Sequence, residues 1–530
     1  MLRPIHTVLP LRRGLPLLSA LMLSSLACGG TGGGSSPQRG RDGVVYTDGA
    51  DIWFAPLDGS GPVTLADSPD REFPLERSGD WVVYARSPQN VNTFWAVRRD
   101  GTGRTSLGAL YYGVVNGRAI IDQPGDATHP QAIASVDLDT GVVTTLGQAV
   151  GPSPANVTAR VLGGEVYLTT DSLSPYGPPG QGQLVQIAAD GTGRTVLLDL
   201  PATPWFVGAG KVLASASQVV GGATEYHYHL ASRDGASRTD LGAFGQSGYG
   251  AQAYGIESEG RPFLVGDQGY FTGWDGSHEA AYQVDLPTGT LRTLVSGLTY
   301  PLYPWTALGG RLIANALTDR EALVSIDGAA QTATPFWNTD GSSYVGQLHG
   351  KVLYVRRRSA LWSDVDLVSS LPDGTGTTTV ALAPDVQTGF RYDVGADSSR
   401  PAVVVGDRVV FRQAVNGQLE LVSTLVDGTS RVVISQGAGT KGLAAVSGNV
   451  VIYRTEVDGL GDLYAVNADG TGHGALATAT DDESFLAVVG ATVVFQRLSP
   501  QGTGTLQAVP LQGGTATTLA PLATSVYAQP

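Results

Sequence analysis

The composition of the 530-residue chain favours an all-β protein. It has 42% hydrophobic and only 15% charged residues, with 72 glycines and 30 prolines. Val, Thr, Tyr and Gly are common while Lys and Glu are scarce, which is typical of short strands joined by tight turns. The net charge of −14 argues against nucleic acid and anionic lipid as partners.

The N-terminal segment has the layout of a secretory signal peptide. Three arginines precede an apolar run, residues 14–27, that is too short to span a bilayer comfortably. The run ends at Cys28, the only cysteine, after the small residue Ala27. This arrangement resembles the lipobox of bacterial lipoproteins, which implies that residues 1–27 are removed and that Cys28 is lipidated. A plain signal peptide cleaved elsewhere is the alternative.

A Gly/Ser-rich tether, residues 28–42, follows the signal peptide and is suited to hold a folded body away from a membrane. Gly29 stands where lipoproteins retained at the inner membrane typically have Asp. The resemblance therefore implies an outer-membrane lipoprotein of the bacterial cell envelope, on its periplasmic or surface face. The body has no second cysteine and so cannot form a disulfide within itself.

A short glycine-containing motif recurs along the rest of the chain. DGTGRT occurs at 100–105 and again at 190–195, and related motifs occur throughout. Eleven copies or variants, 39 to 54 residues apart, begin at Asp58, Asp100, Asp139, Asp190, Asp234, Pro287, Asp327, Asp373, Asp427, Asp469 and Gln512. Such regular spacing indicates a repeat protein.

A second marker runs in phase with the first. A polar turn with Gly precedes a short apolar strand at residues 42–47, 79–85, 117–121, 164–169, 210–215, 260–265, 310–315, 350–355, 406–411, 448–453 and 490–495. The segments between the markers alternate between apolar and polar residues, so each unit is predicted to contain four short strands.

The Asp-Gly motif is predicted to be the hairpin between the third and fourth strands of each unit. Gly takes the positive φ that the turn needs, and Asp can bond the turn backbone. A phosphate-binding loop is the alternative, but that loop requires a Lys at the right place and a long helix after it, and no copy has that helix.

Four-stranded units of this length are typical of β-propeller blades. The unit LYAVNADGTG, residues 463–472, resembles the propeller repeats of TolB and of WD-like propellers in exported bacterial proteins. The resemblance extends from residue 43 to the end. The helical N-terminal domain of TolB is absent, so the role of TolB does not carry over.

Eleven units exceed the usual four to eight of one ring, so we expect two propellers in tandem. The first would span residues 43–261 and the second 262–530, with their boundary between 260 and 311. A single large ring is the alternative. The last strand, near 523–528, is expected to complete the first sheet of its ring.

Candidate residues for chemistry are sparse. His227 and His229 share one strand face with Glu225, which could hold a metal, although the polar solvent face of an edge strand is the simpler interpretation. The other histidines, His6, His129, His278, His349 and His473, are scattered. The acidic groups 456–462 and 480–484 could pair for acid–base work or bind calcium, but 456–462 lacks the length and the final Glu of a calcium loop, and both groups are expected to be solvated loops. The segment 245–250 lacks the spacing of a nucleophile elbow.

Aromatic residues gather at 203–206, 269–276 and 300–305. They fill the core of a propeller or, where exposed, stack on sugar rings or anchor a protein. The segments 172–183 and 264–281 are expected to be long loops at a face or rim, where binding usually occurs.

These features predict a lipid-anchored, non-enzymatic scaffold with no cofactor, no metal and no catalytic residue. Its partner would be a protein or a glycan of the bacterial envelope. The alternatives are an envelope hydrolase or lyase with a site assembled at a propeller axis, and a purely structural spacer.

Overall fold

The computed structural model describes a body built from β-strands. The described residues are 42–49, 51–88, 91–123, 131–148, 156–171, 182–220, 223–246, 262–274, 278–300, 302–317, 321–336, 341–358, 365–384, 402–522 and 527–529. They form 44 strands in eleven four-stranded sheets, which we number 1 to 11 in chain order. No helix in these ranges is long and apolar enough to cross a membrane.

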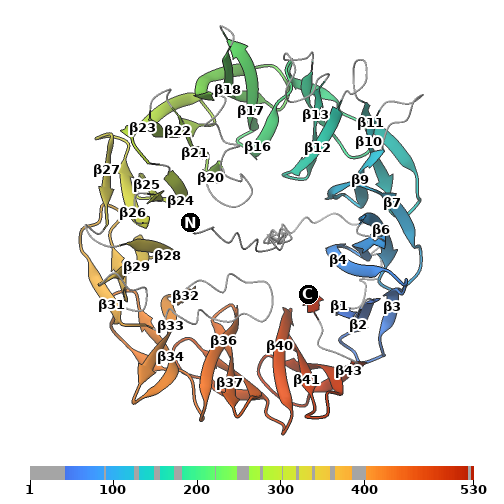
Figure 1. Ribbon diagram of the computed structural model, residues 1–530, viewed down its shortest axis with the longest axis vertical. Helices are drawn as coiled ribbons and strands as arrows, with labels where there is room; N and C mark the ends of the chain where they lie inside the picture. Colours follow the sequence, from blue (N-terminus) through green and yellow to red (C-terminus); the bar gives the residue numbers. More distant parts are fainter. Residues whose placement is uncertain are drawn as a thin grey trace, which may run out of the picture. The chain divides into compact units, whose positions relative to one another are not determined.

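The strands of every sheet pair in the same order, with the first strand nearest the centre of the ring (Figure 1). The first strands, for sheets 1 to 11, are β44 (Tyr527–Gln529), β4 (Arg71–Ser78), β8 (Tyr111–Val115), β12 (Asn156–Leu162), β16 (Thr203–Gly208), β20 (Phe263–Val265), β24 (Leu302–Leu308), β28 (Ser342–Leu348), β32 (Ala402–Val405), β36 (Thr440–Ser447) and β40 (Asp482–Val489). The second strands are β1 (Gly43–Asp48), β5 (Trp81–Ser87), β9 (Arg118–Gln123), β13 (Glu165–Asp171), β17 (Lys211–Val220), β21 (Gln268–Trp274), β25 (Arg311–Leu317), β29 (Lys351–Arg357), β33 (Arg408–Val415), β37 (Val450–Val457) and β41 (Thr492–Leu498).

The third and fourth strands complete each sheet towards its outer edge. The third strands are β2 (Asp51–Pro56), β6 (Thr93–Arg98), β10 (Ala132–Asp137), β14 (Gln183–Ile187), β18 (Ala223–Ser232), β22 (Glu279–Asp285), β26 (Glu321–Asp327), β30 (Val365–Ser370), β34 (Gln418–Leu425), β38 (Leu460–Asn467) and β42 (Gly504–Pro510). The fourth strands are β3 (Val63–Ala66), β7 (Thr105–Gly108), β11 (Val143–Gln148), β15 (Thr195–Leu198), β19 (Arg238–Gln246), β23 (Thr290–Leu298), β27 (Thr332–Pro335), β31 (Thr378–Leu382), β35 (Val432–Val433), β39 (Gly474–Ala477) and β43 (Thr517–Leu522).

The sheets pack on one another in a closed series around a common axis. Among the described residues, one cluster of buried apolar side chains lies at each of the eleven contacts between neighbouring sheets. The cluster between sheets 11 and 1 joins Leu486 and Val494 to Val44. Residues 39–530 form one compact unit. The chain is therefore an all-β protein with the β-propeller fold, as the repeats predict.

The structure does not show two rings, 43–261 and 262–530. Sheet 6 packs on sheet 7 through Tyr270 and Leu312, which leaves no boundary between residues 260 and 311. Sheet 1 contacts sheet 11 instead of sheet 5 or 6. Every sheet presents apolar side chains to both neighbours, so the repeat pattern does not fix how many sheets one ring contains.

Sheet 1 is assembled from both ends of the described chain. The C-terminal β44 pairs antiparallel with β1, with Val45 opposite Gln529, Tyr46 opposite Ala528 and Thr47 opposite Tyr527. This pairing confirms that the last strand completes the first sheet.

The second sequence marker identifies the second strand of each sheet in ten of its eleven copies. The sixth copy, 260–265, is wrong because it covers the first strand of sheet 6, β20. The second strand, β21, follows a Gly266-Asp267 turn and contains the aromatic segment that begins at Gly269. The expected long loop at 264–281 is therefore mostly two strands, since period-two pairing continues through it.

The Asp-Gly motifs form the hairpins between third and fourth strands. In sheet 2, Gly101 N donates to Arg98 O and Arg98 N donates to Thr102 O, which makes a type I turn with a glycine bulge. Gly101 has a φ of +81°. Asp100 accepts bonds from the N and Oγ1 of Thr102 at 2.9 and 2.6 Å, and these bonds lower its pKa.

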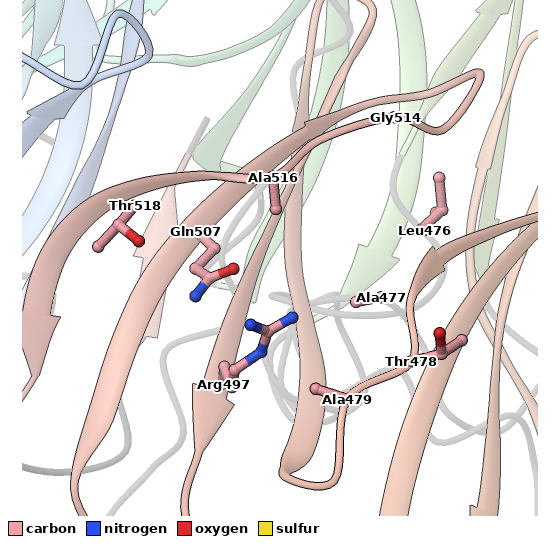
Figure 2. A pocket seen from close by; sticks show the side chains of 9 residues that line it. All are labelled: Leu476, Ala477, Thr478, Ala479, Arg497, Gln507, Gly514, Ala516 and Thr518. Carbon is pink, nitrogen blue, oxygen red and sulfur yellow. The ribbon is translucent and has the colours of Figure 1, made fainter.

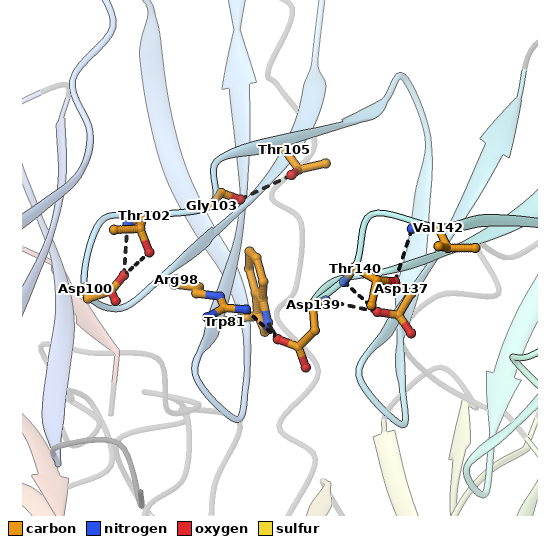
Figure 3. A network of polar contacts seen from close by, with 10 residues as sticks. All are labelled: Trp81, Arg98, Asp100, Thr102, Gly103, Thr105, Asp137, Asp139, Thr140 and Val142. Atoms are coloured by element: carbon orange, nitrogen blue, oxygen red, sulfur yellow. Dashed lines mark hydrogen bonds and ion pairs between the residues drawn. The ribbon is translucent and has the colours of Figure 1, made fainter. Parts of the chain in front are cut away.

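The same turns connect neighbouring sheets. A Cβ added to Gly101 would lie 2.9 Å from the carbonyl oxygen of Thr64, on the outer strand of sheet 1. In Figure 3, Asp139 of the sheet 3 turn accepts bonds from Trp81 Nε1 at 3.2 Å and from Arg98 at 2.9 Å, both in sheet 2. The recurring motif therefore serves both the hairpin and the contact between sheets.

The two faces of the ring differ in how their strands are connected. Because the strands are antiparallel, the first-to-second and third-to-fourth connections share one face, which we call the turn face. Its first-to-second turns have two residues each, such as 79–80 and 490–491. The opposite face, which we call the variable face, takes the remaining connections. They range from the two residues 416–417 to the segments 247–262 and 383–401.

Candidate binding site

The first strands, which lie nearest the axis, carry four carboxylates and no histidine. Each carboxylate has a structural partner: Glu72 with Ser68, Glu76 with the Tyr111 hydroxyl, Asp482 with Arg454 at 2.5 Å, and Glu483 with Arg497 at 3.1 Å. Burial and the neighbouring Glu76 raise the pKa of Tyr111. Each of these carboxylates is therefore engaged within the fold, while one oxygen of each buried glutamate, Glu72 Oε2 and Glu483 Oε2, has no hydrogen-bond partner among the described residues.

Two tryptophans occupy equivalent positions on the first strands of sheets 5 and 7. Each follows a proline and is the extra residue of a bulge, between Pro204 and Phe206 in β16 and between Pro304 and Thr306 in β24. A bulge re-aims the side chain of a strand.

Trp305 is the more accessible of the two tryptophans. It is 38% exposed. Its ring stacks on Tyr344 of the neighbouring β28, with ring centroids 5.6 Å apart and planes 22° apart. Stacking against Tyr344 holds one face of the indole in place while part of the ring remains open to solvent.

Trp205 is half-buried and is fixed by a hydrogen bond and a cation–π contact. Its Nε1 donates to Ser215 Oγ at 2.8 Å. The guanidinium of Arg160, from sheet 4, lies 5.2 Å from the centre of the indole, and Arg160 also donates to Pro204 O. The cation over the ring fixes the orientation of the indole.

Sheet 6 lies between these tryptophans and carries an aromatic residue on its own first strand. Phe263 on β20 stacks on Tyr270 with centroids 5.2 Å apart. Val265, two residues further along β20, is 40% exposed. We call Trp205, Phe263, Trp305 and Tyr344 the aromatic band. Aromatic faces fixed on neighbouring strands can stack on the apolar faces of sugar rings or receive apolar side chains.

The structure brings a further carboxylate to the two neighbouring histidines. His227 lies between Asp240 Oδ2, 3.0 Å from Nδ1, and Glu225 Oε2, 3.3 Å from Nε2. Asp240 belongs to β19 and could not be identified from spacing, because two bulges shift the β18–β19 register. Burial lowers the pKa of His229. β18 is an interior strand, not the edge strand expected.

No three His, Cys, Asp or Glu side chains in the described ranges are arranged to hold a metal ion. His473 bonds the Tyr453 hydroxyl at 2.5 Å, and burial lowers its pKa. His349 lies in a turn at a φ of +51°, and His278 precedes β22. Cys28, His6, His129, the segment 172–181 and most of 245–250 lie outside the described residues.

The acidic group 456–462 forms a tight hairpin in place of a calcium loop. Val457 pairs with Leu460, and the two residues between them have φ values of +53° and +82°. Asp458 and Gly459 are therefore a two-residue turn whose positive φ angles suit the strand twist.

The second acidic group, 480–484, is not the solvated loop expected, because its last three residues begin strand β40. Asp482 accepts bonds from Arg454 and from the backbone N of Gly461. Glu483 is 0% exposed and accepts bonds from Arg497 Nε and from Ala479 N, each at 3.1 Å. Burial raises the pKa of Glu483 to about 7.

Replacing Glu483 by Gln is expected to flatten the pH dependence of stability between pH 4.5 and 7. In that range the folded chain holds a proton that the unfolded chain, with a Glu pKa of 4.5, has released, so the free energy of unfolding falls as pH rises. The groups facing the carboxyl are Arg497, Asp462 and the N–H of Ala479.

The amide of Glu483→Gln keeps an acceptor for Arg497 and Ala479 but does not ionise. The variant should gain roughly 1–3 kcal/mol relative to the unmodified chain between pH 5 and pH 8. Thermal unfolding of both chains at these two pH values measures the difference. Parallel pH profiles would show that Glu483 ionises as an ordinary carboxyl.

No family model and no curated protein matches the sequence, whereas a search of solved structures finds matches at low sequence identity. The tricorn protease is 8% identical over 91% of this chain, with a TM-score of 0.24, and this chain covers 57% of it. TolB from Acinetobacter baumannii is 14% identical over 59% of this chain and 78% of its own, with a TM-score of 0.21. The β-propeller domain of the Trilobed protease from Pyrococcus furiosus is 9% identical over 57% of this chain and 94% of its own, with a TM-score of 0.28. The eleven four-stranded sheets of the chain itself, and not these comparisons, show that it is a β-propeller.

Proposed function

We propose that this protein is a lipid-anchored, non-enzymatic β-propeller that binds a glycan of the bacterial cell envelope through the aromatic band. The observation that carries the proposal is the partly exposed Trp305, fixed against Tyr344 on the first strands of adjacent sheets. Flat aromatic surface fixed before binding loses little conformational entropy when a sugar ring stacks on it.

The anchoring part of the proposal rests on the N-terminal sequence. Cys28 would carry the lipid, and residues 28–42 would separate the ring from the outer membrane. Replacing Cys28 by Ser should then move the chain from the membrane fraction to the soluble fraction. A protein partner at the same surface is the competing interpretation, and an envelope hydrolase or lyase is disfavoured by the pairing of the first-strand carboxylates.

Replacing Trp305 by Ala is expected to weaken glycan binding about tenfold or more, because the exposed stacking surface is removed. Isolated peptidoglycan sacculi, in a sedimentation assay, and soluble chitotetraose, in a calorimetric titration, serve as probes. The change removes a side chain that is already partly in solvent, so the ring should remain folded.

The matched control is Trp95, a half-buried indole on the third strand of sheet 2 that donates to Thr93. Trp95→Ala should leave binding unchanged. Equal losses in both variants, or no binding of either probe by the unmodified chain, would contradict the glycan proposal. Cross-linking of Trp305-proximal positions to an envelope protein would support the protein partner instead.

A further inference from the structure

A second concave surface lies between sheets 10 and 11, away from sheets 5 to 8, which carry the aromatic band. A cavity of about 390 Å³ is lined from sheet 10 by Leu476, Ala477, Thr478 and Ala479, and from sheet 11 by Arg497, Gln507, Gly514, Ala516 and Thr518. Its size is within the range of small-molecule sites. Figure 2 shows Arg497 and Gln507 extending into this space from neighbouring strands.

Arg497 is positioned by a buried acid. Its Nε donates to Glu483 Oε1 at 3.1 Å, and Glu483 has no exposed surface. The two terminal nitrogens of Arg497 have no hydrogen-bond partner among the described residues, the guanidinium carbon lies 5.8 Å from the centre of the Phe495 ring, and the side chain is 26% exposed. The guanidinium is therefore held at one edge and offers its other edge to the cavity.

The other polar groups of the cavity lie in register with Arg497. Gln507 and Thr518 face each other across β42 and β43, and Thr505 of β42 lies opposite Arg497. Gln507 is buried, with only 6% of its surface exposed. Its Nε2 donates a hydrogen bond to Thr505 Oγ1 at 3.0 Å. A buried amide and exposed threonine hydroxyls thus accompany the guanidinium.

This combination selects a class of ligand. A guanidinium pairs with a carboxylate through two parallel hydrogen bonds, whereas amide and hydroxyl groups exchange hydrogen bonds with hydroxyls. We propose that the cavity between sheets 10 and 11 binds a small hydroxy acid, with its carboxylate on the terminal nitrogens of Arg497 and its hydroxyls on Gln507 and Thr518.

The charge of the neighbouring acid is compatible with anion binding. Because burial raises the pKa of Glu483 to about 7, a large share of the molecules carry an uncharged Glu483 near neutral pH. In those molecules the positive charge of Arg497 is not neutralised by its partner, and a bound carboxylate supplies the missing negative charge.

Sheet 2 offers a matched arginine that should not bind such a ligand. Arg86 lies opposite Glu72, as Arg497 lies opposite Glu483. Arg86, however, already binds Asp70 through both Nε at 2.7 Å and Nη2 at 2.6 Å. Asp70 thus already uses one terminal nitrogen of Arg86, whereas both terminal nitrogens of Arg497 lack a hydrogen-bond partner among the described residues.

The test is calorimetric titration of the full chain with D-gluconate, and with sorbitol as the same polyol without a carboxylate. Gluconate should bind with a Kd of about 1 mM or below, and sorbitol should not bind. Arg497→Gln should weaken gluconate binding at least tenfold, while Arg86→Gln and Trp305→Ala should leave it unchanged.

Thermal unfolding will show whether Arg497→Gln folds. Gln507→Leu is a second variant that leaves the Arg497–Glu483 pair in place. It should weaken gluconate binding several-fold. The proposal is overturned if gluconate does not bind, if both Arg497→Gln and Gln507→Leu bind it normally, or if Arg86→Gln weakens it equally. Loss of binding in Trp305→Ala alone would assign the ligand to the aromatic band.

Discussion

A chain that ends at residue 526 is expected to lose the closed ring and to unfold at a lower temperature than the complete chain. Its sheet 1 would lack β44, which pairs with β1 and also contacts β40 of sheet 11. Val45 and Tyr46 would be left at an open sheet edge although both are buried in the complete ring. The cost should be on the order of 3–5 kcal/mol, from lost ladder hydrogen bonds and uncovered apolar surface.

The open edge of β1 should also recruit other strands, because unpaired backbone groups at an edge pair with another chain. Thermal unfolding and size-exclusion chromatography measure the two effects. Adding a synthetic peptide of residues 521–530 should restore much of the lost stability, whereas the same peptide with Ala528→Pro should not. A truncated chain that stays monomeric and unfolds at the original temperature would show that β44 does not close the ring.

The second large effect is expected for alanine at Gly101. The residue has a φ of +81°, and a Cβ there would lie 2.9 Å from the carbonyl oxygen of Thr64. Alanine would suffer both the left-handed backbone and a collision with the outer strand of sheet 1. We expect a loss of about 2–4 kcal/mol, because the turn must move away from sheet 1 or distort.

Alanine at Gly374 serves as the control that separates the cost of the left-handed backbone from the cost of the collision. Gly374 occupies the same position in another DGTG turn with a φ of +82°, but a Cβ there would meet nothing within 4 Å. Gly374→Ala should therefore cost only about 1 kcal/mol, from the backbone alone. Urea unfolding of the two variants gives the difference, and equal losses would show that the turn does not pack tightly on the preceding sheet.

The repeats contain most of the information needed for the fold. Period-two strands and Asp-Gly turns are local, so composition and spacing predict each four-stranded sheet. The number of sheets in the ring is not local, because it depends on how each apolar face meets the next. The short strand β20 was assigned as a second strand because its apolar run resembles the true one, which starts after Gly266-Asp267.

The candidate sites depended on register, which the sequence does not provide. The pairs Pro204-Trp205 and Pro304-Trp305 are visible in the sequence, but only the bulges show that both tryptophans have equivalent positions. Glu483 and Arg497 meet because β40 and β41 pair at those residues. The contact between Asp240 and His227 could not be predicted either, because it depends on the register of β18 and β19.

The unequal faces of the ring determine where this architecture can accept added sequence. On the turn face, every described first-to-second turn keeps two residues, and some hairpin glycines, such as Gly101 and Gly191, pack against a neighbouring sheet. On the variable face, equivalent second-to-third connections differ in length, as 416–417 and 499–503 do, while the sheets around them keep the same four strands. A reporter domain or an epitope grafted at 416–417 would therefore sit on a scaffold that already accommodates such variation, and libraries of new recognition loops could be built on that side without redesigning the core.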